Sequence, residues 1–185
     1  MEHAFPNRTA AGRLLAEKLV NYAGCDDVIV LGLPRGGVRV LNQDVVRAIP
    51  HAEEAIEAVT AKETAELERR EHIYREGRPA PELRDRVVIL VDDGLATGAT
   101  MRAAVKALRQ RGVAKIVVAV PVGPPDTCRE IEQEADETIC LSTPPFFQAV
   151  GQYYEDFSQT SDEDVRELLS QAAQDMSERN QTNQQ

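Results

Sequence analysis

The chain has 185 residues, enough for one domain with a substantial core but short for two domains of ordinary size. Its formal net charge of -10 excludes the clustered Lys and Arg surface with which proteins track nucleic-acid phosphates. No continuous apolar stretch marks a membrane span or a signal peptide, and the three cysteines lack CxxC spacing, so we expect a cytoplasmic protein with buried, unpaired cysteines.

The first part of the chain predicts a helix and then a buried strand. Asn7 is suited to cap a helix that runs to Tyr22. The run Asp27–Leu33 is short, apolar and β-branched, which is typical of a strand buried on both faces of a parallel sheet. A further short strand is expected over Val38–Leu41, and the heavily charged segment Pro50–Arg75 has helical composition.

A strand-helix-strand unit occupies the middle of the chain, with Val87–Val91 and Lys115–Val120 as the strands and Ala99–Arg111 as the helix. The remaining expected elements are a short helix, a fourth strand, an irregular aromatic stretch and a last helix: Pro125–Ala135, Glu137–Leu141, Thr143–Phe157 and Asp162–Ala173. Residues 174–185 are expected to be a disordered tail. We therefore predict one α/β domain over residues 1–173, with a mainly parallel sheet and helices on both faces.

The segment from Val88 to Thr100 carries the chemistry, because a buried strand ends there in Asp92 and Asp93 and a loop of small residues then opens a helix. Ligands of open α/β sheets bind at the carboxyl ends of the strands. Backbone amides and the helix dipole can hold an anion along the loop residues Ala96, Thr97, Gly98, Ala99 and Thr100. Adjacent carboxylates suit sugar hydroxyls or a divalent cation, so a phosphosugar site is predicted. The alternative is a salt-bridged or helix-capping acidic pair beside a plain turn.

Together with Leu31–Val38 (LGLPRGGV) and Tyr153–Thr160 (YYEDFSQT), this segment resembles the type I phosphoribosyltransferase family, in particular a bacterial branch of predicted phosphoribosyltransferases. The resemblance implies that Asp92 and Asp93 contact the ribose hydroxyls of phosphoribosyl pyrophosphate, and Mg²⁺ indirectly. It implies a Rossmann-like core, and a small-residue loop that wraps the 5-phosphate. By position, Arg35 and Gly36 inherit the pyrophosphate loop, so the catalytic residues implied are Arg35, Asp92 and Asp93.

The activity implied is transfer of the phosphoribosyl group to a small nitrogenous acceptor, a nucleobase, with release of pyrophosphate in nucleotide salvage. The cofactor implied is Mg²⁺. The acceptor itself is not implied, and a homo-oligomer is an open expectation. An aromatic set near the C-terminus either stacks on the acceptor base or plugs the core: Phe146, Phe147, Tyr153 and Tyr154.

The chain departs from the family pattern between Leu33 and Val87, where a helix, a second parallel strand and a basic loop are expected. Here Pro34–Val38 runs directly into Arg39. A parallel crossover needs a dozen or more residues, so we predict that a strand-helix segment is missing after Val38 and that turnover is impaired. A non-catalytic module that binds phosphoribosyl pyrophosphate or a nucleotide is the alternative function. A sugar-phosphate phosphatase is a remoter one, for which the sequence offers no recognisable nucleophile.

Overall fold

The computed structural model describes residues 4–33, 65, 69, 73 and 80–182, with side chains up to residue 172. Five expectations therefore lie outside the described residues: Arg35, Gly36, the strand over Val38–Leu41, the junction after Val38 and most of the segment Pro50–Arg75.

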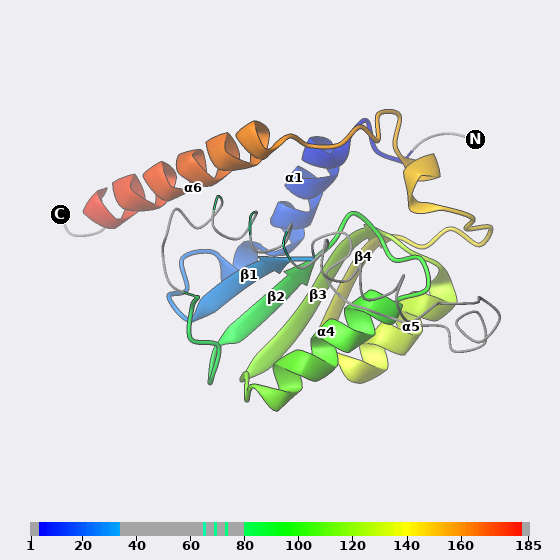
Figure 1. Ribbon diagram of the computed structural model, residues 1–185, viewed down its shortest axis with the longest axis horizontal. Coiled ribbons are helices and arrows are strands. Elements are labelled where there is room, and N and C mark those ends of the chain that lie inside the picture. Colours follow the sequence, from blue (N-terminus) through cyan, green and yellow to red (C-terminus); the bar gives the residue numbers. More distant parts are fainter. Residues whose placement is uncertain (1–3, 34–64, 66–68, 70–72, 74–79, 183–185) are drawn as a thin grey trace.

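A four-stranded, fully parallel sheet forms the centre of the described chain, as predicted (Figure 1). Its spatial order follows the sequence: β1 (Val28–Gly32), β2 (Val87–Val91), β3 (Lys115–Val122) and β4 (Glu137–Ser142). Gly32 pairs with Val91, and Val91 with Ala119, so the strands end at a common edge. The predicted end of β3 before Pro121 is wrong, because the strand continues to Val122, whose carbonyl oxygen accepts a hydrogen bond from the amide of Leu95 at 2.8 Å.

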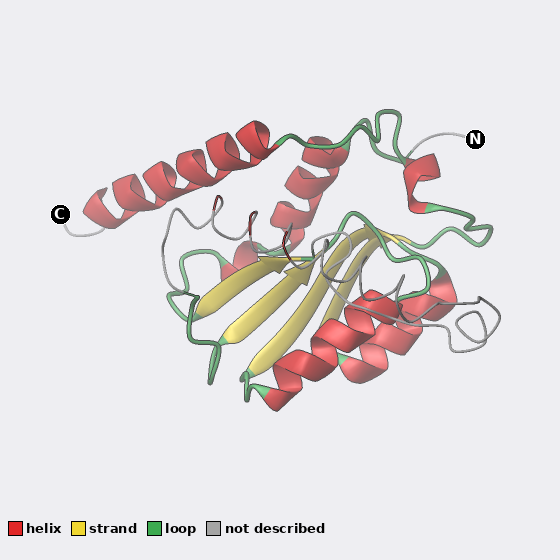
Figure 2. Ribbon diagram, in the orientation of Figure 1, coloured by secondary structure: helices red, strands yellow, loops and turns green. Residues whose placement is uncertain are grey.

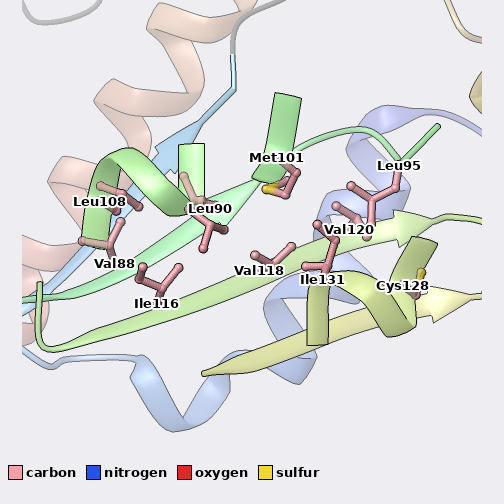
Figure 3. Close-up of a cluster of buried hydrophobic side chains, with 11 residues drawn as sticks. Val88, Leu90, Leu95, Met101, Leu108, Ile116, Val118, Val120, Cys128 and Ile131 are labelled. Carbon is pink, nitrogen blue, oxygen red and sulfur yellow. The ribbon is translucent and has the colours of Figure 1, made fainter. Parts of the chain in front are cut away.

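Helices cover both faces of the sheet (Figure 2). On one face lie α4 (Ala99–Gln110) and α5 (Pro125–Glu134), and on the other α1 (Arg8–Lys18) packs over β3 and β4. Successive strand residues point to opposite faces, so Val88 packs toward α4 and α5 while Ile89 packs toward α1. The larger core lies between the sheet and α4 and α5 (Figure 3): Val88, Leu90, Leu95, Met101, Val105, Leu108, Ile116, Val118, Val120, Cys128 and Ile131.

The first helix begins where the sequence predicts, since the side-chain oxygen of Asn7 accepts a hydrogen bond from the amide of Ala10 at 2.9 Å. It ends at Lys18 rather than Tyr22, and the 3₁₀ helix η1 (Val20–Tyr22) completes the segment. Leu15 from its apolar face is buried against the sheet, as predicted.

The last helix, α6 (Asp162–Thr182), is longer than predicted. The expected end at Ala173 is wrong, and so is the expectation of a disordered tail for residues 174–182. No Pro or Gly follows Ser161, and strong helix formers such as Ala, Gln, Glu and Met continue the helix without requiring a buried face. The helix extends away from the sheet (Figure 1). No helix within the described residues has the length and apolar character to cross a membrane.

The cysteines lie in three different surroundings. Cys128 on α5 is buried and Cys140 on β4 is half-buried, but Cys25 is exposed in the turn before β1, so the prediction of a buried Cys25 is wrong. Cys25 stays exposed because a short turn has no helix or sheet face packed over its side chains.

Candidate functional site

The acidic pair lies at the carboxyl edge of the sheet. Asp92 and Asp93 directly follow β2, and both side chains are partly exposed. The amide of Leu33 donates to the carbonyl oxygen of Val91 at 3.0 Å, so the chain that leaves β1 starts beside Asp92. The structure therefore brings together the ends of the two strands from which the predicted sugar and pyrophosphate residues come, although Arg35 and Gly36 lie outside the described residues.

The loop Gly94–Gly98 is fixed at both ends and open at its tip. Leu95 is buried in the core, and its amide is held by Val122 of β3. Ala96 and Thr97 are exposed, and the carbonyl oxygen of Ala96 accepts a hydrogen bond from the hydroxyl of Thr127 at 3.2 Å. Backbone amides can bind a phosphate when the loop that carries them is exposed to solvent on one side and fixed by contacts on the other.

The helix α4 offers its N-terminus to this loop. Its cap, Gly98, has a φ of 69° and no side chain with which to satisfy the first amides, and no acidic residue lies in the first turn. The first amides of a helix have no intrahelical partner, and the helix dipole adds positive potential there. The start of α4 is thus chemically suited to an anion.

Gly98→Ala should lower the free energy of unfolding by about 1–2 kcal/mol, because a side chain is costly at positive φ. A Cβ atom there would also lie 2.7 Å from Cγ2 of Thr127. The matched control is Gly12→Ala in α1, where a Cβ atom meets nothing within 4 Å and helix propensity favours Ala by about 0.5–1 kcal/mol. Urea unfolding of both variants measures the difference, and equal stabilities would contradict the strain assigned to Gly98.

Arg8 is the residue that the sequence analysis missed. Its guanidinium group donates to Oδ2 of Asp93 twice, from Nε at 3.0 Å and from Nη2 at 2.7 Å. It also donates to the carbonyl oxygens of Phe157 and Ser158 and lies 3.7 Å from the centroid of the Phe157 ring. One side chain from the start of α1 therefore joins the acidic pair to the C-terminal segment. An Arg in the first turn of an amphipathic helix gives no sequence signal for such a role.

A second contact to the acidic pair comes from the C-terminal segment itself. Tyr154 is buried, and its hydroxyl donates to the carbonyl oxygen of Asp93 at 2.6 Å. Burial first, and then the negative charge of Asp93, raises the pKa of Tyr154, so the phenol stays protonated and remains a donor. The backbone of Phe5 pairs with residues 153 and 155 on the other side of this segment. The two ends of the domain thus meet at Asp93.

The aromatic set divides between core and surface. Tyr154 is in the core, and Phe147 and Tyr153 stack on each other with centroids 5.4 Å apart. Phe146 is 86% exposed. Val150, in the 3₁₀ helix η2 (Val150–Tyr153), lies so close to Gly94 that a Cβ atom there would sit 2.7 Å from Cγ1 of the valine. The segment therefore covers the start of the loop, with Phe146 as its exposed ring.

Few of the described side chains at the site could coordinate a metal ion. Within the described residues no three His, Cys, Asp or Glu side chains come together as a metal site. Mg²⁺ is usually held by one or two carboxylates together with water and substrate phosphates, so Asp92 and Asp93 fit an ion that is shared with a bound phosphosugar.

A parallel α/β sheet with two acids and a small-residue loop at its carboxyl edge has the arrangement with which open α/β domains bind ligands. The family model of the phosphoribosyl transferase domain matches residues 3–158, and the chain belongs to this family.

Proteins and a solved structure that are similar in sequence are consistent with membership of this family. The Mycobacterium tuberculosis protein "Putative phosphoribosyl transferase Rv0571c" is 39% identical over 214 residues, which cover 94% of this chain and 48% of the relative. The Bifunctional protein PyrR of Clostridium acetobutylicum is 29% identical over 57% of this chain and 62% of its own length. The crystal structure of TT1426 from Thermus thermophilus superposes with a TM-score of 0.63, at 36% identity over 89% of this chain and 97% of that one.

The match to the mycobacterial relative has two features of length. The chain spans about half the length of that relative. The alignment runs over 214 residues while this chain has 185, so at least 29 aligned positions are occupied in the relative alone. The second feature supports the prediction that an internal segment is missing here.

Proposed function

We propose that this chain binds phosphoribosyl pyrophosphate at the carboxyl edge of the sheet and transfers the phosphoribosyl group to a nitrogenous acceptor, a nucleobase, with release of pyrophosphate. The observation that carries the proposal is the loop Gly94–Gly98, which is anchored by Leu95, exposed at Ala96 and Thr97, and followed by α4, whose cap residue Gly98 has no side chain to bind the first amides. This cradle adjoins two carboxylates in a chain of the phosphoribosyl transferase family.

Each part of the site has its own task in this proposal. Asp92 and Asp93 accept hydrogen bonds from the ribose hydroxyls and orient the sugar, while the amides and hydroxyls of residues 96–100 hold the 5-phosphate. Arg35 and Gly36, which follow β1 in sequence, hold the pyrophosphate as it departs from C1. Asp92 and Asp93 would hold Mg²⁺ indirectly, and the ion would supply positive charge to the pyrophosphate. Catalysis is then mainly positioning and electrostatic stabilisation of a cationic sugar.

We further propose a cytoplasmic location and a role in nucleotide salvage. The unpaired cysteines and the acidic composition support the first, and membership of the family supports the second.

Phosphoribosyl pyrophosphate with Mg²⁺ should raise the melting temperature by about 5–10 °C at a concentration about 100-fold above its Kd, since a ligand bound only by the folded state stabilises it. Ribose 5-phosphate should raise it less, because it lacks the pyrophosphate contacts. Differential scanning fluorimetry measures both shifts. No shift at millimolar donor, with the protein folded by circular dichroism, contradicts the proposal.

Two single variants locate the site. Asp92→Asn and Thr97→Val should each weaken donor affinity by about 10- to 100-fold, equivalent to the 1.5–3 kcal/mol of a hydrogen bond to a charged group. Thr160→Val, at an exposed threonine before α6, should leave the affinity unchanged. Unchanged affinity in Asp92→Asn and in Thr97→Val would move the donor site elsewhere.

A non-catalytic module that binds the donor is the second candidate, and the relative's additional aligned positions favour it. If these additional positions lie after Val38, the residues missing from this chain would include the basic loop and the residues that support Arg35. Donor binding without pyrophosphate release, across a screen of nucleobases and amines, supports this candidate. Donor-dependent release with any acceptor supports the transferase.

A further inference from the structure

Two cysteines from different elements meet behind the loop Gly94–Gly98. The sulfur atoms of Cys128 on α5 and Cys140 on β4 lie 2.9 Å apart. Non-bonded carbon atoms pack at about 3.5–4.0 Å, and sulfur is larger than carbon. A disulfide bond of about 2.05 Å is therefore within a small movement of the two side chains. Cys25 is separate from this pair, in the exposed turn before β1.

The two thiols differ in reactivity and access. The hydrogen bond between the sulfurs lowers the pKa of Cys128 and raises that of Cys140, so Cys128 ionises first and supplies the reactive thiolate. Cys128 is buried, while Cys140 is half-buried and gives an oxidant access to the pair. The sulfur of Cys140 also lies 3.4 Å from the carbonyl oxygen of Ser142, at the end of β4.

The two cysteines lie next to the residues that hold the loop Gly94–Gly98 in place. Cys128 is in the first turn of α5, next to Thr127, whose hydroxyl holds the carbonyl oxygen of Ala96. Its sulfur also lies against Gly123, where a Cβ atom would be 2.9 Å from the sulfur and 3.0 Å from Cβ of Leu95. Any bond that fixes Cys128 therefore fixes the turn on which the loop rests.

We propose that Cys128 and Cys140 form a reversible disulfide that ties the first turn of α5 to β4 behind the loop. Two S–H bonds break and one S–S bond forms, and the two protons and two electrons reduce one molecule of hydrogen peroxide to two of water. In a reducing compartment such a bond is transient and responds to oxidants. This proposal does not rest on the proposed function.

Hydrogen peroxide treatment of the whole chain tests the proposal. A proteolytic map should recover one linked pair, Cys128 with Cys140, whose mass is two hydrogen atoms below the sum of the two reduced peptides. The melting temperature should rise on the order of 5 °C, because the bond closes a loop and restricts the unfolded chain, and dithiothreitol should reverse both changes.

Two variants provide the controls. Cys25→Ser removes the exposed thiol and should behave as the unmodified chain, whereas Cys140→Ser should show neither the linked pair nor the rise in melting temperature. The proposal is overturned if Cys128 and Cys140 can both still be alkylated after peroxide has oxidised Cys25. A linked pair with an unchanged melting temperature overturns the claim that the bond fixes α5. The map is read on the unmodified chain, so the test stands even where a variant folds poorly.

Discussion

Arg8→Ala should lower the free energy of unfolding by about 2–4 kcal/mol. The variant loses the fork to Asp93, the hydrogen bonds to two backbone carbonyls and the contact with the Phe157 ring. It also removes the guanidinium group that pairs with the Asp93 carboxylate. The side chains of Arg8 and Asp93 are 21% and 22% exposed, so solvent weakens the ion pair and the estimate stays below that for a fully buried one. Urea unfolding measures the loss.

Arg13→Ala is the matched control, because Arg13 is exposed on the same helix, and it should change stability by no more than about 0.5 kcal/mol. Arg8→Lys should fall between the two, since an ammonium group keeps the charge but cannot form the planar fork. A double-mutant cycle of Arg8→Ala with Asp93→Asn should give a coupling energy of about 0.5–3 kcal/mol. Equal stabilities of Arg8→Ala and Arg13→Ala would show that the contacts of Arg8 carry no net energy.

The two acids of the pair have different contacts, and Arg8 contacts Asp93. The alternative of a salt-bridged pair correctly describes part of Asp93, since its Oδ2 atom accepts from Arg8. Asp92 is oriented locally instead, with its Oδ1 atom accepting from the amide of Asp93 at 2.8 Å. A variant of Asp93 is therefore expected to change stability and donor binding together.

The sequence predicts the sheet well because its signals are local. The strands β1 and β2, and β3 after Lys115, are continuous apolar runs, and Asn7 and Gly112 mark helix ends in the expected way. The boundary errors at the ends of β3 and α6 have different causes. The strand β3 continues past Pro121, and the carbonyl oxygen of Val122 accepts a hydrogen bond from the amide of Leu95. Helix propensity sustains α6 beyond Ala173, where no buried face is predicted.

The candidate site is predictable only where it is contiguous in sequence. The segment Val88–Thr100 forms one strand-loop-helix unit, so its residues meet without help from elsewhere. The contacts of Arg8 with Asp93, 85 residues away, and with Phe157, 149 residues away, depend on tertiary packing. The same holds for Tyr154, whose aromatic character suggests base stacking but whose burial makes it a support of Asp93.

The last prediction concerns the junction between Val38 and Arg39, where we expect this chain to bind the donor far better than it turns the donor over. Asp92, Asp93 and the loop Gly94–Gly98 are held by contacts within the described domain, so the cradle forms whatever happens after β1. In the proposed mechanism, turnover also needs Arg35 in place as pyrophosphate leaves. A misplacement of about 1 Å at such a group can reduce the rate 10²-fold.

Grafting the unmatched segment of the mycobacterial relative between Val38 and Arg39 should therefore raise donor-dependent pyrophosphate release by about 10²-fold or more, while donor affinity changes little. The edge of the sheet gives a second readout. Val30 of β1, which is at the edge among the described strands, is 59% exposed, and an exposed apolar edge favours self-association. The grafted chain should accordingly stay monodisperse at concentrations where the present chain associates, as measured by sedimentation velocity. If the present chain releases pyrophosphate with its acceptor as fast as the grafted one, the segment is dispensable, and the loss at the junction has no bearing on catalysis.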